Sequence, residues 1–509
     1  MQTRPRLPLR LALVLPFVLP LLAACSGGEP VVFTHGVASG DSLPDGAVLW
    51  TRVDREVELT VEVATDPGFT DVNLEEKVRA EEARDFTTKI EVSGLETGRP
   101  YYYRFRKGDD VSPVGTFRTA PEPDNPEGVS FVFSGDSDGT VGEDGARPFD
   151  FQVLDAMRRE EADFFLYIGD TIYADSTLGP RALSLEAYRA KHKTNREVDR
   201  LRELLASTAS YAIWGDRDVQ DDFAGEAANA EQSVSAEQFA AGLQAFREYL
   251  PIGGDDRPET LYRSFRWGQD VEIIILDERS FRVGGAAAAC TPAGASAPDL
   301  LPALGAPGVP DPYRNLRASA GLPPNTEAAC LAALNDPNRT MLGNQQLQAL
   351  FDVIQESDAT FKFIVNEVPV SELVTLPYDR WEGYRAERDD LLRFIGNQGR
   401  GNIVFLSTDL HASVISDVRV NLASLPVAVE AITGPIADRT LGDTIAETQG
   451  EPAVGLFEQL LGQVTQPECV EFDASSYGLV EVDPDARTAT ITLKDQDGRQ
   501  LCQRVLPAQ

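Results

Sequence analysis

The stretch Phe164-Phe165-Leu166-Tyr167-Ile168-Gly169-Asp170-Thr171-Ile172-Tyr173 decides the fold class of this chain. It begins with a run of apolar and aromatic residues, a pattern typical of a strand buried in a mostly parallel sheet. The run ends at a glycine followed by an aspartate. Because open α/β sheets bind ligands beyond the carboxyl ends of their strands, Asp170 is predicted to lie at such an edge. An ordinary turn is the alternative, since Gly-Asp is common in loops.

Similar strand patterns recur between residues 128 and 509 and alternate with helical patterns, which is typical of an α/β domain. Besides these, the sequence predicts a strand at Val271–Asp277, a closing hairpin over Tyr477–Lys494, and helices at Phe151–Arg159, Leu185–Ala206, Ala236–Tyr249 and Met341–Glu356. Polar residues follow each of the main strands: Asp136 and Asp138 after Val129–Phe133, Asp170 and Tyr173 after Phe164–Ile168, Asp216, Arg217, Asp221 and Asp222 after Tyr211–Trp214, Asn366 and Glu367 after Phe361–Val365, and Asp409 and His411 after Asn402–Leu406. If the strands run parallel, these side chains converge on one edge of the sheet.

Carboxylates gathered at such an edge need a counter-charge. Two of them about 4 Å apart repel by roughly 4 kcal/mol at an effective dielectric near 20, and their pKa values rise unless something compensates. Metal ions are the usual compensation, and oxygen ligands with one histidine and one phenol favour iron(III), calcium, manganese or magnesium. Two such ions can activate water for an in-line phosphoryl displacement. Singly, Tyr173 could be a core aromatic residue and His411 a core histidine; their joint occurrence at strand ends favours a metal centre.

The first residues predict an export signal. Three arginines precede an apolar run, Leu11–Leu22, that is too short to span a bilayer, so residues 1–24 are predicted to be a signal peptide. Leu22-Ala23-Ala24-Cys25 resembles a bacterial lipoprotein box, which makes Cys25 the expected lipidation site and residues 25–29 a lipidated tether. We therefore expect an exported lipoprotein of the cell envelope, on a periplasmic or cell-surface face, that contacts the membrane only through this anchor.

The charge of the chain limits its partners. With 81 acidic and 46 basic side chains, the formal net charge is -35. Such a surface repels nucleic acid and anionic lipid and attracts cations, so no nucleic-acid-binding surface is expected. Solubility or adaptation to salt is an alternative reason for the excess of acid. His192 lies in a charged helical stretch and is interpreted as a solvated residue, and we expect a monomer.

Residues 30–122 predict an all-β module. Val57–Val63 alternates between apolar and polar residues, and Gly98–Phe105 places an aromatic strand after a turn, as fibronectin- and immunoglobulin-like sandwiches do. His35 is interpreted as structural, because it stands alone in a turn-rich stretch. A linker rich in proline and acid then leads into the α/β domain, residues 128–509.

The remaining four cysteines indicate disulfides, because exported proteins fold under oxidising conditions. Four cysteines permit three pairings, of which we predict the nearest-neighbour one, Cys290–Cys330 and Cys469–Cys502. Loops of roughly 30 to 40 residues closed in this way contribute about 4 kcal/mol each on a chain-entropy argument. The first bridge would hold residues 283–338, which are rich in Ala, Gly and Pro. We interpret them as a capping insertion near the site, with a flexible surface loop as the alternative.

These elements, in this order, resemble the motifs of calcineurin-like metallophosphoesterases and, more narrowly, the PhoD-type alkaline phosphatase/phosphodiesterase family. Phe33–Arg52 is similar to the family's opening, Gly169–Tyr173 to its second motif and Ile213–Gly225 to its third. Further matches are Asn338–Gly343, Asn366–Pro369, Asp409–His411 and Ala431–Ile436. The resemblance implies a four-layer αββα sandwich behind the β-module. It also implies hydrolysis of phosphomonoesters, phosphodiesters or both by metal-activated hydroxide.

The resemblance further implies roles for single residues. Asp170 would bridge metal ions, Tyr173 would bind a ferric ion as a phenolate beside calcium ions, and Asp136 would replace a cysteine ligand to iron. The predicted metal ligands are Asp136, Asp170, Tyr173, Asp216, Asp222, Asn366, Asp409 and His411, and the predicted ions are Ca²⁺ and Fe³⁺. Arg217 and Asp138 are the predicted catalytic residues.

Three features depart from the family pattern, namely Asp136, the stretch Gly215-Asp216-Arg217, and Thr408. Arg217 stands where the family has a histidine. A guanidinium cannot release a proton at neutral pH, but it can clamp a phosphate through two hydrogen bonds. Loss of the cysteine favours calcium or another hard ion over iron. Two alternatives stay open: a phospholipase D-like phosphodiesterase, suggested by the envelope location, and a cation-binding surface lipoprotein with impaired catalysis, suggested by Gly215 and Arg217.

Overall fold

The computed structural model describes residues 30–508 except 226–233, 256, 308, 310–313, 316, 319–320, 399–401 and 422. The predicted signal peptide, the tether and the lipidation site Cys25 lie outside these residues. Within the described part of the chain, none of the helices is both long enough and apolar enough to span a bilayer.

A nine-stranded sheet carries the first group of predicted strands. Its order is β21-β20-β19-β9-β10-β11-β1-β2-β5. The strands are β1 (Phe33–Leu43), β2 (Gly46–Val53), β5 (Thr87–Val92), β9 (Val129–Ser134), β10 (Phe164–Ile168), β11 (Ala209–Ile213), β19 (Ser476–Asp483), β20 (Thr488–Asp495) and β21 (Gln500–Pro507). Strands β9, β10, β11 and β1 run parallel to one another, so β9, β10 and β11 end at the same edge of the sheet.

A seven-stranded sheet packs against the first. Its order is β12-β13-β14-β15-β17-β16-β18. The strands are β12 (Arg263–Trp267), β13 (Val271–Ile275), β14 (Phe361–Val365), β15 (Ile403–Ser407), β16 (Ser413–Val418), β17 (Ala428–Ile432) and β18 (Cys469–Glu471). Aromatic side chains join the two sheets: the Phe131 and Phe363 ring centroids lie 5.0 Å apart, and those of Phe164 and Trp267 lie 4.6 Å apart. The inner faces of the two sheets therefore form one continuous core.

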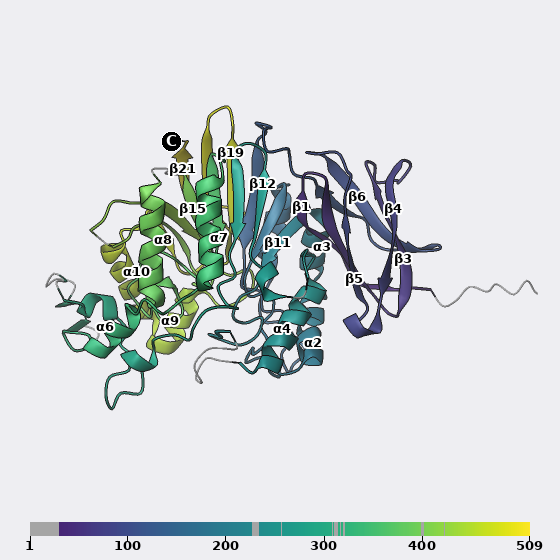
Figure 1. The fold of residues 1–509 in the computed structure, drawn as a ribbon. Coiled ribbons are helices and arrows are strands. Elements are labelled where there is room, and N and C mark those ends of the chain that lie inside the picture. The colour runs from purple at the N-terminus through teal and green to yellow at the C-terminus, as the bar shows by residue number, and fades with distance from the viewer. Residues whose placement is uncertain are drawn as a thin grey trace, which may run out of the picture.

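Helices cover the two outer faces of this pair of sheets. On the nine-stranded side lie α1 (Gln152–Arg159), α2 (Leu185–Arg196), α3 (Asp199–Ser207) and α4 (Ala236–Tyr249), and on the other side α7 (Gly343–Glu356) and α8 (Arg385–Asn397) (Figure 1). The period of two along β13 explains the packing, because Ile273 and Ile275 face the other sheet while Ile274 packs with α7 and α8. The predicted four-layer αββα sandwich is confirmed.

The N-terminal strands form a sandwich that shares a sheet with the rest of the molecule. A separate five-stranded sheet contains β3 (Val57–Ala64), β4 (Val72–Ala80), β6 (Pro100–Lys107), β7 (Asp110–Val111) and β8 (Gly115–Arg118). Leu49 of β2 packs against it in a core that includes Val61, Tyr103 and Phe105. Strand β1 in turn pairs with β11, with Ser39 opposite Ala209. The β-module therefore continues the ladder of the α/β sheet rather than following it as a separate unit.

Both nearest-neighbour disulfides are present. Cys469–Cys502 joins β18 and β21, the end strands of the two large sheets, and Cys290–Cys330 closes the insertion. The insertion, residues 283–338, includes the short helix α6 (Ala328–Leu334) and lies at the opposite end of the molecule from the β-module (Figure 1). Two more helices, α9 (Leu441–Gln449) and α10 (Glu451–Val464), are found near it.

The interpretation of His192 as a solvated residue is wrong. This side chain on α2 is 3% exposed and stacks on Tyr249 of α4, with ring centroids 5.2 Å apart. The charged pattern of α2 is a local property of the sequence, whereas the contact with α4 is tertiary. Burial and the nearby Arg196 lower the pKa of His192 to about 3, so it is neutral in the folded protein.

Candidate metal centre

The carboxyl ends of strands from both large sheets meet at one place. Asp136 follows β9, Asp170 follows β10 and Asp216 follows β11, while Glu367 and Asp409 follow β14 and β15 of the facing sheet. Thr408 ties the two ends together, because its hydroxyl donates to the Ile168 carbonyl (2.9 Å). The sequence predicted one edge of one sheet; the structure builds the site from two sheets.

Asp216 is the hub of the acidic residues. Its carboxylate lies within 4.8 Å of carboxylate oxygens of Asp170 and Glu367, and also within 4.8 Å of those of Asp379 and Asp409. A third group with the same spacing joins it to Asp221 and Asp222. Side chains that are far apart in the sequence therefore form a continuous acidic cluster.

His411 completes the other side of the centre. Its Nε2 lies 3.3 Å from the Tyr173 hydroxyl and 3.9 Å from a carboxylate oxygen of Asp136. Its Nδ1 lies 2.6 Å from the Arg439 carbonyl oxygen. Because a carbonyl only accepts, Nδ1 carries the proton and donates it there, which leaves the Nε2 lone pair facing Asp136 and Tyr173. This is the tautomer that a metal ligand requires.

The backbone at the candidate ligands is unusual. Positive φ angles occur at Asp136 (58°), Asp170 (47°), Asp222 (56°), Asp409 (63°) and His411 (57°). Non-glycine residues rarely adopt this left-handed region, and they concentrate at functional sites when they do. The sharp turn directly after each strand is what brings the side chain back over the sheet edge.

Burial makes the negative charge of the centre costly. Asp136, Asp170 and Asp409 have pKa values well above the usual range, chiefly because they are buried and further because they repel neighbouring carboxylates. The Asp379 carboxylate, together with burial, raises the pKa of Asp222 to about 8. Without a cation these groups take up protons, so the cluster is arranged to attract positive charge.

Two buried oxygens fit a metal ion. Asp136 Oδ2 and Asn366 Oδ1 have no hydrogen-bond partner, and their residues are 1% and 0% exposed. The Asn366 amide nitrogen donates to the Val368 carbonyl (2.7 Å) and to the Ser407 hydroxyl (2.8 Å), which fixes Oδ1 as the free atom. An unsatisfied buried acceptor costs about 1–3 kcal/mol, and hard cations are suitable partners for such oxygens.

Arg279 is a buried residue of the centre that the sequence analysis did not identify. It is 0% exposed, and its Nη2 donates to Glu367 (2.6 Å) and to Asp379 (2.8 Å). The same nitrogen lies 3.7 Å from Asp216 and 4.0 Å from Asp409. Glu367 is thus held mainly by an internal cation. The available signal was the position of Arg279 just after the predicted strand Val271–Asp277; Asp379 follows no strand and carried no such signal.

Close packing against Asp170 explains why residue 215 is a glycine in this chain. A Cβ at this position would lie 2.2 Å from Asp170 Oδ1 and 2.5 Å from the Asp170 backbone nitrogen. Next to it, the Arg217 backbone N–H donates to Asp170 Oδ1 (3.0 Å). The departure from the family pattern at Gly215 therefore makes room for Asp170, whereas the backbone contact at position 217 does not depend on the side chain.

The two predicted catalytic residues differ in how many of their polar atoms already have partners within the protein. The Arg217 guanidinium pairs with Asp221 (2.7 Å) and Asp175 (3.3 Å), yet its side chain remains 31% exposed. Asp138 is buried, and its two oxygens accept from the Thr140 N–H (2.8 Å) and the Ser176 hydroxyl (2.6 Å). Asp138 therefore holds its own loop in place, whereas Arg217 has N–H groups to spare.

A cavity of about 370 Å³ opens beside the centre. Asp138, Tyr173, Arg217, Asp409 and His411 contribute to its polar wall. The apolar wall is formed by Phe149, Leu178, Leu410 and Leu441. An ester bound here would have its phosphate beside the carboxylates and its organic group on apolar surface.

Comparisons with known proteins agree with this geometry. A family model described as PhoD-like phosphatase matches residues 144–493, and one described as PhoD-like phosphatase, N-terminal domain, matches residues 23–121. Alkaline phosphatase D of Bacillus subtilis (strain 168) is 28% identical over 427 residues, which cover 76% of this chain and 66% of that protein. The chain thus spans just under two thirds of that relative.

Two solved structures share the fold. The structure of PhoD superposes with a TM-score of 0.71 at 23% identity and covers 95% of this chain and 94% of its own. Purple acid phosphatase PPD1 from yellow lupin (Lupinus luteus) superposes with a TM-score of 0.54 at 11% identity, covering 94% of this chain and 74% of its own. At these identities the likeness is one of fold.

Proposed function

Because the chain belongs to the PhoD-like phosphatase family, we propose that it hydrolyses phosphate esters, monoesters or diesters, with metal ions held by the acidic centre. The observation that carries this proposal is the meeting of strained strand ends from two sheets around Asp216, with two buried oxygens that lack donors.

The residues that would hold the ions include two groups. Asp136, Tyr173 and His411 lie together, and Asp170, Asp222 and Asp409 each lie near Asp216. Asn366, whose buried Oδ1 has no hydrogen-bond partner, is proposed as a further ligand. Bound ions would act as Lewis acids and lower the pKa of water. A ligand set of oxygen donors with a single imidazole favours Ca²⁺, and the Tyr173 oxygen is also a suitable ligand for Fe³⁺.

Arg217 is proposed to bind the substrate phosphate. Burial opposes its charge, but Asp216, Asp221, Asp170 and Asp175 together raise the pKa of Arg217 above its usual value, so it stays charged. A guanidinium has five N–H donors in a planar fork, and those not used by Asp175 and Asp221 can meet phosphate oxygens in the cavity. Since it cannot release a proton, the leaving group must take one from water or depart as a stable anion. Asp138 is proposed to support catalysis by fixing the wall of the cavity.

The location and boundaries of the protein are part of the proposal. We keep the signal peptide over residues 1–24, lipidation of Cys25 followed by the tether 25–29, a monomeric state and no nucleic-acid partner. We also keep the division into an N-terminal module, 30–122, and a catalytic domain, 128–509. Two disulfides support export, because such bonds persist in oxidising compartments.

A chelator experiment tests the proposed activity. The purified protein is assayed with 4-nitrophenyl phosphate and bis(4-nitrophenyl) phosphate before and after metal is stripped with EDTA, and again after Ca²⁺ is restored. We expect activity that disappears with the metal and returns with it. Full activity of the metal-free protein would overturn the proposal, and bound metal without turnover of either ester would support the alternative of an impaired cation-binding lipoprotein.

The apolar wall of the cavity favours a second candidate, a phospholipase D-like phosphodiesterase. Phe149, Leu178, Leu410 and Leu441 offer surface to an organic group larger than a sugar or an alcohol. Vesicles of phosphatidylcholine provide the test: release of choline at a rate comparable to the best nitrophenyl ester would establish this candidate, and no release would leave the soluble esters as substrates.

A further inference from the structure

A strained segment connects the acidic centre to the insertion. The strap, residues 373–379, has positive φ at Val374 (59°) and at Leu376 (46°). Such angles are rare outside glycine and are genuine outliers for a β-branched residue, so they persist only where the surroundings fix them. The strap ends at Asp379, a member of the acidic cluster.

The insertion provides much of what fixes the strap. The Leu376 N–H donates to the Leu300 carbonyl (2.9 Å), and the Val374 side chain is fully buried against Leu301 and Leu304. The Val374 N–H donates to Glu382 (2.9 Å) on the other side. The unusual backbone of the strap thus depends on contacts with residues around position 300.

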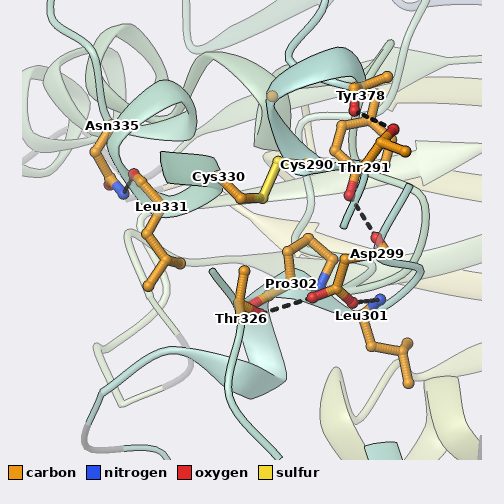
Figure 2. Close-up of a disulfide and its surroundings, with 12 residues drawn as sticks. Cys290, Thr291, Asp299, Leu301, Pro302, Thr326, Cys330, Leu331, Asn335 and Tyr378 are labelled. Atoms are coloured by element: carbon orange, nitrogen blue, oxygen red, sulfur yellow. Dashed lines mark hydrogen bonds between the residues drawn. A yellow bond between two sulfur atoms is a disulfide. The ribbon is translucent and has the colours of Figure 1, made fainter. Parts of the chain in front are cut away.

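Asp299 is the hub of the insertion, and it lies beside the disulfide. Its N–H donates to the Cys290 carbonyl (2.8 Å), and its carboxylate accepts from Arg317 (2.8 and 2.9 Å) and from the Thr326 hydroxyl (2.9 Å). Its own carbonyl accepts from the Tyr378 hydroxyl (Figure 2).

Tyr378 connects this hub to the strap. It is 7% exposed and lies near both cysteines of the disulfide (Figure 2), in an apolar cluster that also includes Leu334. The next residue is Asp379, whose oxygens accept from Arg279 (2.9 and 2.8 Å) and from Arg282.

Arg279 carries the connection into the centre. Besides Asp379 it binds both oxygens of Glu367, and Glu367 in turn accepts from the Asp216 backbone N–H (2.9 Å). A continuous set of contacts therefore runs from the Cys290–Cys330 bridge through Tyr378, Asp379 and Arg279 to Asp216.

We propose that the insertion closed by Cys290–Cys330 is a positioning element for the acidic centre and that Tyr378 is the residue through which it acts. This inference rests on the proposed metal-dependent function. It assigns the insertion a role in setting metal affinity, beyond that of a cover. Outer residues that orient metal ligands typically change affinity by about 10- to 100-fold when altered, which sets the expected size of the effect.

The test measures binding of Mn²⁺ to the metal-stripped full chain by isothermal titration calorimetry. Tyr378→Phe removes one hydroxyl and keeps the ring, and Cys290→Ser/Cys330→Ser opens the bridge. Cys469→Ser/Cys502→Ser is the matched control, because it opens a bridge of similar loop length that joins β18 to β21. We expect Tyr378→Phe and the first pair to weaken Mn²⁺ binding by about tenfold or more, and the control pair to leave it within about twofold.

The outcomes separate this inference from the proposed activity. Equal Mn²⁺ affinity in the folded wild type and Tyr378→Phe proteins overturns it, as does an equal loss in both cysteine pairs. If Cys290→Ser/Cys330→Ser does not fold, Tyr378→Phe decides alone. A purely structural role would lower the melting temperature of Tyr378→Phe without changing its Mn²⁺ affinity. If the wild type binds Mn²⁺ but hydrolyses no ester, the proposed activity fails while the affinity differences still decide the role of the insertion.

Discussion

Two clusters of buried like charge stand in this molecule, and they differ in what their surroundings allow. The acidic centre consists of Asp136, Asp170, Asp216 and Asp409. The basic cluster, between the β-module and helix α2, consists of His35, Arg52, His192 and Arg196. Both contain buried polar atoms without a hydrogen-bond partner, so burial and orphaned atoms alone do not distinguish a functional site from a structural one.

The backbone and the covering distinguish them. Residues His192 and Arg196 lie on the regular helix α2, whereas the acidic residues lie on turns, most of them with positive φ. The Arg196 guanidinium lies 4.4 Å over the Trp50 ring and donates to the Tyr249 carbonyl (2.6 Å). Aromatic faces thus enclose the basic cluster, while the acidic centre opens onto a cavity.

The two clusters also relieve repulsion differently. In the basic cluster the guanidinium groups hold their protons, and the Asp85 carboxylate pairs with Arg52 (3.1 Å). The histidines stay neutral: burial, helped by Arg52 and Arg196, lowers the pKa of His35 to about 3, and His192 behaves alike. The carboxylates of the acidic centre can instead be relieved by protons or by metal ions. We therefore interpret the cluster that exchangeable cations can neutralise as the site, and the cluster that an internal carboxylate and neutral histidines relieve as part of the packing.

Removing one carboxylate from the acidic centre gives the largest expected effect. Asp170→Asn should lower kcat/KM by about 10³-fold, which corresponds to about 4 kcal/mol, because the buried Asp170 carboxylate lies within 4.8 Å of those of Asp216 and Glu367 and is predicted to bind metal. The same change should raise the melting temperature of the metal-free protein, because it removes a buried carboxyl group that must either repel its neighbours or take up a proton on folding. Asp358→Asn is the control, as its side chain is 95% exposed. Unchanged kcat/KM in Asp170→Asn would contradict the assignment of the centre.

Metal binding should stabilise the fold, and it should do so through the acidic centre. At a Ca²⁺ concentration of 100 times Kd, linkage predicts a gain of about 2.7 kcal/mol in the free energy of unfolding. Calorimetry of the EDTA-treated protein, with and without Ca²⁺ and with KCl added to equal ionic strength, measures it. No difference between the two salts would show that the carboxylates bind no calcium.

Acid should destabilise the fold through the basic cluster. His192 has a pKa of about 3 in the folded protein against 6.5 for a free histidine, so between these values only the unfolded chain takes up the proton. The free energy of unfolding therefore keeps its full value above pH 6.5 and decreases as the pH falls toward 3. Between pH 7.5 and pH 5 the loss amounts to about 2 kcal/mol. His192→Phe keeps the stack on Tyr249 and removes the titration. Urea unfolding at both pH values should show a smaller loss in the variant, and an equal loss would contradict the pKa of His192.

Much of the fold was predictable because its signals are local. The apolar run Phe164–Ile168 is a strand as predicted, and Ala236–Tyr249 is a helix with the predicted bounds. The partner of a strand is not a local property: nothing in Phe33–Leu43 shows that it pairs with β11, since any strand offers the same backbone groups. The charged pattern around His192 was misleading for the same reason.

The residues of the candidate site differ in the same way, because only some of them follow a local sequence pattern. Residues that directly follow a buried strand, such as Asp170 and Asp409, could be proposed from the sequence because strand ends share an edge. Asp379 could not, because it reaches the centre on a strap whose path is set by the insertion. The roles of the individual predicted ligands stay predictions until metal is bound and measured.

Arg217 offers the smallest and most specific test of the comparison, because its side chain pairs with Asp221, borders the cavity and remains partly exposed. Arg217→Lys keeps the charge and so leaves the repulsion among Asp175, Asp216 and Asp221 compensated, but it removes the planar fork that can hold two phosphate oxygens. We expect KM for the best nitrophenyl ester to rise about tenfold, close to 1.4 kcal/mol, with a smaller change in kcat. Arg181→Lys is the control, because Arg181 donates to Gln220 instead.

A fall in kcat with unchanged KM would instead assign Arg217 to the transition state. No change in either kcat or KM would make Arg217 a counter-charge that, like the arginines of the basic cluster, only holds its neighbours together.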